Sequence, residues 1–179
     1  MAQGTTQHAP VTVRQVSSAA DIAVIAKCFH SYTQWLGKDL SHQNYEAEVA
    51  NLPGKYAPPT GALLLAVDSE SDAPLGCVAM RPLQLPADHP SARDGRKCAE
   101  IKRLFVYPEA RGRNVARTLV KELIVRAESE GYAEVFLDTL PSMTAAIRLY
   151  ESEGFDIVAP YYNSPWEETI YFSRKTPVQ

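Results

Sequence analysis

The stretch VYPEARGRNVARTLV, residues 106–120, decides the fold because it joins the end of a strand to the start of a helix through a basic loop. An alternating segment ends there, Pro108 makes a turn, and apolar residues then recur at helical spacing. Three arginines, Arg111, Arg113 and Arg117, surround the first turn of that helix. Cations are unfavourable at the positive end of a helix dipole, so we expect a negative group at this point.

The loop that precedes this helix has the features of a phosphate site. The first turn of a helix leaves backbone N–H groups free, and the helix dipole places partial positive charge behind them. Gly112 allows the backbone to approach a ligand closely. Ala116 has a small side chain, which leaves room for a ligand at the first helical turn. Arginine side chains supplement the amides, because guanidinium groups bind phosphate oxygens well. The alternative is that the three arginines only solvate the end of a helix.

Composition and motifs argue against several function classes. The chain has 179 residues, 45% of them hydrophobic, and a net charge of -3, which argues against a general nucleic-acid binder. No GxxxxGKS or GxxxxGKT motif occurs and no GxGxxG follows a strand segment, so nucleotide hydrolysis and Rossmann cofactor binding are disfavoured. No apolar run approaches the roughly 20 residues that span a bilayer. The widely separated Cys28, Cys77 and Cys98 indicate buried thiols in a reducing compartment rather than a zinc site or disulfides.

Periodicity predicts one α/β domain over residues 10–176, preceded by a disordered tail at residues 1–9. Period-two or continuous apolar runs predict strands at residues 11–16, 61–68, 75–83, 97–107, 133–139, 155–159 and 167–173. Helical spacing and capping residues predict helices after Ser17 or Ser18 up to Gly37, from Ser41 to about Leu52, from the arginine loop to Gly131, and from a Ser142 cap to Gly154.

Two stretches, EIKRLFVYPEARGRNVARTLV (100–120) and AAIRLYESEGF (145–155), resemble the acetyl-CoA core of the GNAT acyltransferase superfamily. The resemblance covers residues 97–158, and it implies a mixed central sheet of about seven strands flanked by about four helices. The pyrophosphate motif of that family aligns with Arg111, Gly112, Arg113, Asn114, Val115 and Ala116, with Arg117 following. Asn114 stands where the family usually has glycine, and asparagine tolerates left-handed and cap conformations better than other residues do. The resemblance implies acetyl-CoA as co-substrate and no metal.

The chemistry of acyl transfer requires a neutral amine, a stabilised oxyanion and a protonated leaving thiolate. The resemblance assigns the oxyanion to backbone amides at Leu104, Phe105 and Val106 on a splayed strand. It assigns the acid to Tyr150, because a phenol is protonated at neutral pH. The alternative for Tyr150 is a purely structural place in the apolar stripe of its helix.

The base and one cofactor contact are less closely determined by the sequence. Glu100 is a candidate base, acting through a water, and its alternative is an ordinary solvent-facing strand residue. Asp138 is the next candidate. Many family members carry asparagine before the last helix, where this chain has Met143, so Ser142 is expected either to replace that cofactor contact or to cap the helix.

The resemblance implies that the first helix pair and the connection between the last two strands wall the acceptor pocket. Both regions are rich in proline and in aromatic rings with polar edges, which suit a small amine or an amino acid. With the acidic Asp138, the expected substrate-binding residues are Tyr32, Trp35, Tyr56, Tyr161 and Tyr162, together with Trp166. Ordinary turn and core roles are the alternative for each single residue.

We therefore expect an N-acetyltransferase that moves the acetyl group of acetyl-CoA to a primary amine of a small molecule by direct transfer in a ternary complex. A protein lysine or N-terminal acetyltransferase is a second interpretation, and a catalytically silent acyl-CoA-binding module is a third. The expected location is the cytoplasm, with the nucleus as the alternative, and we expect no nucleic-acid or membrane partner. The sequence is compatible with a homodimer.

Overall fold

The computed structural model describes residues 8–92 and 95–177, so most of the expected N-terminal tail lies outside the described residues. Its strands and helices follow the predicted order of strand, two helices, three strands, helix, strand, helix and two strands. Their bounds are β1 Val11–Gln15, α1 Ala19–Leu36, α2 Tyr45–Ala50, β2 Ala62–Asp68, β3 Pro74–Leu83, β4 Cys98–Val106, α3 Val115–Ser129, β5 Glu134–Thr139, α4 Thr144–Ser152, β6 Asp156–Ile157 and β7 Ile170–Lys175.

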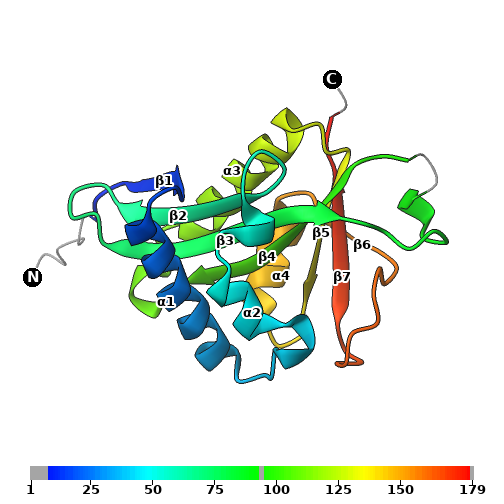
Figure 1. Cartoon of the computed structure of the whole chain (residues 1–179), viewed down its shortest axis with the longest axis horizontal. Helices are drawn as coiled ribbons and strands as arrows, with labels where there is room; N and C mark the ends of the chain where they lie inside the picture. Colours follow the sequence, from blue (N-terminus) through cyan, green and yellow to red (C-terminus); the bar gives the residue numbers. More distant parts are fainter. Residues whose placement is uncertain (1–7, 93–94, 178–179) are drawn as a thin grey trace, which may run out of the picture.

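The strands form one seven-stranded sheet in the order β1-β2-β3-β4-β5-β7-β6. All neighbours are antiparallel except β4 and β5, which run parallel because α3 carries the chain back between them. Helices α1 and α2 cover one face of the sheet, and α3 and α4 cover the other (Figure 1). This arrangement confirms the predicted mixed sheet flanked by four helices.

Two hydrophobic layers hold the helices against the sheet, and β2 contributes to both. Alternate side chains of a strand point to opposite faces, so Leu64 packs on the α3 side while Leu63 and Leu65 pack on the α1 side. The continuous apolar run of β2 exists because helices cover both of its faces. On the α3 side the partners are Leu119, Val120, Leu123, Ile124 and Ala127; on the α1 side they are Ile25, Cys28 and Phe29.

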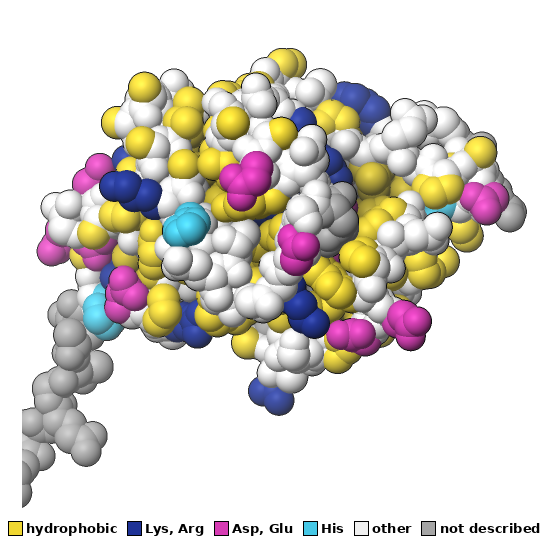
Figure 2. All heavy atoms as spheres, turned by 60° about the horizontal axis from the view of Figure 1, so that its bottom comes forward, with side chains coloured by type: hydrophobic (Ala, Val, Ile, Leu, Met, Phe, Trp, Pro, Cys, Tyr) yellow, Lys and Arg dark blue, Asp and Glu magenta, His cyan; other side chains and the backbone are white. Residues whose placement is uncertain are grey.

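The surface carries charges of both signs in a scattered pattern. Figure 2, in which the lower side of Figure 1 is turned forward, shows Lys and Arg side chains standing apart from one another among Asp, Glu, hydrophobic and neutral groups. This face therefore shows no broad basic region among the side chains that are drawn in colour.

Three local predictions were wrong. The helix expected from Ser41 to Leu52 is a 3-10 turn over Ser41–Gln43 and then the short α2, because Asn44 adopts a left-handed conformation with φ 57° and interrupts the helix. Helix α4 begins after Met143, and no side chain caps it, so Ser142 is not the cap. The sixth strand is confined to the two residues of β6.

The packing of α3 gives the first prediction. Leu123 is fully buried between α3 and the sheet, whereas Val125 on the same helix is 58% exposed. Leu123→Ala should lower the free energy of unfolding by about 2–5 kcal/mol, because it leaves a cavity in the core. Val125→Ala, the matched control, should change it by less than about 0.5 kcal/mol. Urea denaturation followed by circular dichroism measures both, and equal losses would contradict the assignment of the core.

Candidate active site

The central sheet opens between its two parallel strands. β4 and β5 pair at only three positions, and Glu100 with Phe136 is the last of them. Beyond that point β4 continues along β3 and β5 continues along β7, without pairing to each other. The diverging segments line a narrow cavity of about 90 Å³, and its wall includes Lys102, Arg103, Leu104, Leu137, Asp138 and Thr139. The backbone groups that β4 turns toward this opening have no strand partner there.

A bulge on β4 lies at the same opening. The register with β3 shifts between Cys77, opposite Phe105, and Ala79, opposite Lys102, so two residues of β4 face one of β3. Arg103 adopts a left-handed φ of 59° there, and Leu104 follows it on the cavity wall. The structure therefore places Leu104 beside the bulge, whereas Phe105 and Val106, the other two expected amide donors, are in register with Cys77 and Gly76.

The start of α3 keeps its amides open. Asn114 is the N-cap in the left-handed conformation, with φ 59°, and its side chain makes no capping hydrogen bond. The residue that replaces the usual family glycine thus adopts a conformation that favours glycine. Gly112 has φ 81°, and no atom lies within 4 Å of where its Cβ would stand. The N–H groups of the first turn, at Val115, Ala116 and Arg117, therefore have no side-chain cap.

Two of the three loop arginines have carboxylate partners within the chain. Arg113 donates to Asp68 Oδ2 at 2.7 Å and to the carbonyl oxygen of Ala9 at 2.7 Å. The Arg113 guanidinium is the main reason why the pKa of Asp68 lies well below its usual range. Arg117 pairs with Glu153 and donates to Ser152 Oγ at 3.0 Å.

Arg111 differs from the other two arginines. Its guanidinium lies over the ring of Trp35 at 5.4 Å from the centroid, and it has no carboxylate partner among the residues that the structure describes. For Arg113 and Arg117 the expected negative groups are carboxylates of the chain itself, Asp68 and Glu153. Arg111 is therefore the arginine of the loop whose charge is not paired with a carboxylate within the described residues.

Tyr150 lies both in the core and on the wall of the narrow cavity. Its ring packs against Phe155 and Phe172, and it forms part of the lining together with Met143 and Ala146. Burial is the main cause that raises the pKa of its hydroxyl well above the ordinary value, and the hydroxyl therefore stays protonated at neutral pH. The two interpretations of Tyr150, packing and proton donation, are compatible in this position.

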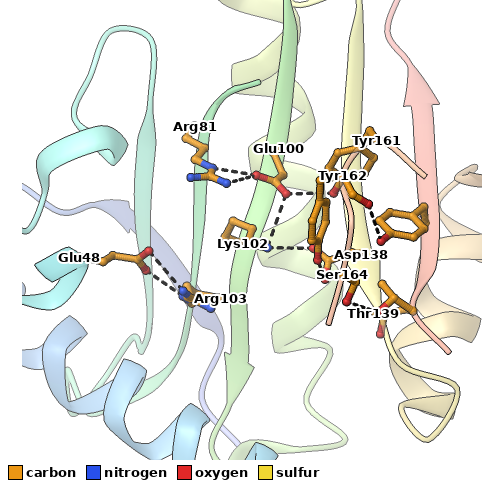
Figure 3. A network of polar contacts seen from close by, with 12 residues as sticks. Glu48, Arg81, Glu100, Lys102, Arg103, Asp138, Thr139, Tyr161, Tyr162 and Ser164 are labelled. Carbon is orange, nitrogen blue, oxygen red and sulfur yellow. Dashed lines mark hydrogen bonds and ion pairs between the residues drawn. The ribbon is translucent and has the colours of Figure 1, made fainter. Parts of the chain in front are cut away.

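Glu100 is buried rather than solvent-facing, which corrects the alternative interpretation of this residue. Its Oε2 accepts a hydrogen bond from Arg81 Nε at 2.7 Å, and its Oε1 accepts one from the Tyr161 hydroxyl at 3.0 Å. The Lys102 ammonium stands 3.5 Å from the same Oε1. Figure 3 shows these groups converging on the carboxylate from β3, β4 and the segment after β6.

An ion pair bridges the opening of the sheet. Lys102 Nζ on β4 donates to Asp138 Oδ1 on β5 at 2.8 Å, and the Tyr162 hydroxyl donates to Asp138 Oδ2 at 3.1 Å. Burial favours a higher pKa for Asp138, but the charge and hydrogen bond of Lys102, together with the Tyr162 hydroxyl and the Arg103 charge, outweigh burial and the pKa is lowered. Burial likewise works against the charged form of Lys102, and the Asp138 and Glu100 carboxylates reverse this so that its pKa is raised.

A second buried pair fixes α2 to the bulge. Arg103 donates to Glu48 through Nε at 2.8 Å and through Nη2 at 3.2 Å, and Lys55 Nζ lies 2.6 Å from Glu48 Oε2. Sequence reasoning missed Arg81, Lys102 and both members of this pair. Glu100 and Lys102 stand two residues apart on a strand, which places them on one face, and this spacing was the only signal available.

The predicted acceptor residues separate into three groups. Tyr161 and Tyr162 line a wider cavity of about 630 Å³, and Tyr32, Trp35, Trp166 and Asp138 line the narrow one. Tyr56 lines neither of these two: it is buried in the core beside Phe29 and borders a separate cavity together with Glu48 and Lys55. Ser142 is exposed and lies on the wall of neither cavity.

Within residues 8–92 and 95–177, no group of three or more His, Cys, Asp or Glu side chains is arranged to hold a metal ion. No helix in the same ranges combines the length and the apolar character needed to cross a membrane.

Comparison with known proteins defines the class. Residues 26–155 match the Acetyltransferase (GNAT) family. An uncharacterized N-acetyltransferase of Schizosaccharomyces pombe is 38% identical over 161 residues, covering 90% of this chain and 92% of that protein. Human N-acetyltransferase 8 is 28% identical over 123 residues, covering 69% of this chain and 51% of that protein. The chain therefore belongs to the GNAT family and is an N-acetyltransferase, a class that uses acyl-CoA donors.

Solved structures agree on the fold. A GNAT-family acetyltransferase of Staphylococcus aureus superposes with a TM-score of 0.70 at 14% identity, over 93% of this chain and 99% of that chain. Arabidopsis thaliana NAA60, in complex with a bisubstrate analogue, superposes with a TM-score of 0.68 at 17% identity, over 94% and 99% of the two chains. At these identities the likeness establishes the fold and does not identify the acceptor substrate.

The bridge across the sheet gives the second prediction. Lys102→Met removes the ammonium that two buried carboxylates share, so it should lower the free energy of unfolding at pH 7 by about 3–5 kcal/mol. Because the pKa of Asp138 is lowered in the folded state, the stabilisation that it gains from Lys102 is present above about pH 4 and is lost as the pH falls further. Urea denaturation at pH 7 and at pH 3 should therefore show a smaller loss at the lower pH.

The control for this prediction is Lys38→Met. Lys38 pairs with Glu168 at 4.0 Å on the surface, so its loss should change the free energy of unfolding by no more than about 1 kcal/mol. Equal effects of the two substitutions would show that the bridge does not hold the sheet together.

Proposed function

We propose that this N-acetyltransferase transfers an acetyl group from acetyl-CoA to the primary amine of a small molecule. The observation that carries the proposal is that two cavities meet at Lys102 and Gln43, which line both. The narrow one lies in the opening between β4 and β5 and suits an extended thioester arm. The wider one, at about 630 Å³, falls within the range of small-molecule pockets.

The residues at the start of α3 fit the diphosphate of coenzyme A. The uncapped N–H groups of Val115, Ala116 and Arg117 would donate to its oxygens, and the free space beside Gly112 allows them to approach. Arg111 would add a positive charge that no carboxylate of the described chain takes up. In this proposal Arg113 and Arg117 act differently, because they position the loop through Asp68 and Glu153.

Three groups along the cavities would perform the transfer. When bound, the co-substrate supplies an activated acetyl group. The backbone amide of Leu104, beside the bulge, would donate to the negative charge that develops on the carbonyl oxygen. The Tyr150 hydroxyl, held protonated by burial, would give its proton to the departing thiolate. Glu100 is the one carboxylate on the wall of the wider cavity in the described chain, and it would take the ammonium proton through a water.

The lining of the two cavities supports direct transfer in a ternary complex. A covalent acetyl-enzyme would need a nucleophile such as a thiolate within reach of the thioester. Cys28, Cys77 and Cys98 are buried, and none of them lines either cavity. Burial also raises the pKa of Cys98 to about 11, so its thiol is protonated at neutral pH.

The third prediction tests the function itself. The protein should gain thermal stability from coenzyme A, and the backbone resonances of residues 111–117 should shift on titration. With acetyl-CoA and a pool of small primary amines, free thiol should be released and acetylated amines should be found by mass spectrometry. Labelling of proteins or peptide N-termini without any labelled metabolite would replace the small-molecule acceptor with a protein. Binding of coenzyme A without any turnover would indicate a silent module.

The fourth prediction concerns the acid. Tyr150→Phe keeps the ring between Phe155 and Phe172 and removes only the hydroxyl, so kcat should fall by about a hundredfold or more, with the Kd for coenzyme A unchanged. Steady-state kinetics and calorimetry measure the two quantities. Tyr132→Phe is the matched control, because its hydroxyl bonds to the Thr60 carbonyl and its ring lines neither cavity. A Tyr150→Phe variant that acetylates at the wild-type rate would remove this residue from the mechanism.

A further inference from the structure

The wall of the wider cavity presents cations, while their carboxylate partners lie deeper. The side chains of Lys55 and Arg81 are 36% and 32% exposed, and both residues line the cavity. Their partners Glu48 and Glu100 are 3% and 2% exposed. A molecule that enters the cavity therefore meets two positive groups before it meets the carboxylates beneath them.

The charges in this region do not cancel. Two networks of ion pairs lie here. Lys55 and Arg103 pair with Glu48, and Arg81 and Lys102 pair with Glu100 and Asp138, so four positive charges accompany three negative ones and the excess lies around Glu48. One positive charge remains, although the whole chain has a net charge of -3. This excess is therefore a property of the site. It disfavours a cationic ligand and favours one that carries a negative group.

Hydrogen-bond donors remain for such a group. A guanidinium has five N–H donors, and Arg81 uses its Nε and Nη2 atoms on Glu100, so Nη1 is left for another acceptor. No other residue in the described parts of the chain accepts a hydrogen bond from Arg81. The Lys55 ammonium has three donors, and Glu48 stands against one side of it at 2.6 Å. Guanidinium and ammonium donors of this kind bind a carboxylate through charge-assisted hydrogen bonds.

A complementary group lies where the two cavities meet. Gln43 lines both cavities, and its Oε1 is buried without a hydrogen-bond partner among the described residues. A buried carbonyl oxygen without a donor is unfavourable, and an amine N–H of a ligand would satisfy it. Lys102 lines both cavities as well, and its charge favours the neutral, reactive form of a nearby amine over the ammonium form.

We infer that the acceptor is an amine that carries a carboxylate, that is, a molecule of the amino-acid class. Arg81 and Lys55 bind its carboxylate in the wider cavity, and Gln43 Oε1 accepts from its amine at the entrance to the narrow cavity. The same wall disfavours polyamines and lysine-rich peptides, whose ammonium groups meet the unbalanced positive charge. This inference rests on the proposed function and specifies its acceptor.

Matched pairs of acceptors test the inference. L-Phenylalanine and phenethylamine differ only in the carboxylate, as do L-leucine and isopentylamine, and 4-aminobutyrate extends the spacing between the amine and the carboxylate. Thiol release from acetyl-CoA should give at least a tenfold higher kcat/KM for at least one carboxylate-bearing member over its partner, at equal concentration of the neutral amine. Spermidine and an oligolysine peptide should be the poorest acceptors.

Variants of the wall then link the preference to its residues. Lys55→Gln should raise KM for the preferred carboxylate acceptor about tenfold more than it raises KM for the decarboxylated partner, so the preference shrinks. Arg81→Gln should also reduce the preference for the carboxylate-bearing acceptor. Because it removes the hydrogen bond to Glu100 as well, it should affect turnover of both acceptors. Lys121→Gln, on the exposed side of α3, is the matched control and should change neither. Thermal unfolding of each variant separates a loss of folding from a loss of recognition.

The outcomes separate the two proposals. Decarboxylated amines or spermidine that react as well as the amino acids, or a preference that survives both substitutions, would overturn the inference while leaving the acetyltransferase intact. If no amine releases thiol, the proposed function fails instead. The inference is then decided by calorimetric titration of the same pairs into the protein with coenzyme A, in which only the carboxylate-bearing members should bind.

Discussion

The site depends on the ion pair between Lys102 and Asp138, which spans the place where β4 and β5 stop pairing. Two parallel strands that separate leave open backbone groups and an unfilled space, and neither is stable in a core without compensation. The pair compensates by joining the two halves of the sheet through side chains where the backbone no longer joins them. Both residues of the pair also line the narrow cavity.

A buried ion pair is weak support for stability, since the cost of removing two charges from water is comparable to their attraction. Here the pair is one part of a longer chain of contacts that runs from Arg81 through Glu100 and Lys102 to Asp138. Well-packed apolar residues would close the opening with less desolvation. In the proposed mechanism the charges have a use instead: they would keep a polar, positively biased wall beside the point where the amine loses a proton and attacks.

Local patterns were sufficient to predict the order of the strands and helices, and the family resemblance then predicted the mixed sheet. The apolar stripe of α3 and the continuous apolar run of β2 are local signals, and Gly37 and Gly131 mark helix ends without tertiary information. The site beyond the loop could not be predicted in this way. Arg81 meets Glu100 across a strand register, and Glu48 reaches Arg103 from a short helix, so neither contact has a fixed spacing in the sequence.

The arginine loop shows that a local argument can predict a need for negative charge without identifying the residues that supply it. A helix start surrounded by three guanidinium groups requires negative charge, and the fold supplies it to Arg113 and Arg117 from Asp68 and Glu153. These carboxylates lie 45 and 36 residues away along the chain, so the sequence offers no means to assign them. Both ion pairs tie the loop to other elements of the fold. In the proposed cofactor site, a loop already neutralised and fixed at two of its arginines would present its uncapped amides and Arg111 to a diphosphate with little reorganisation, which is what preorganised binding requires.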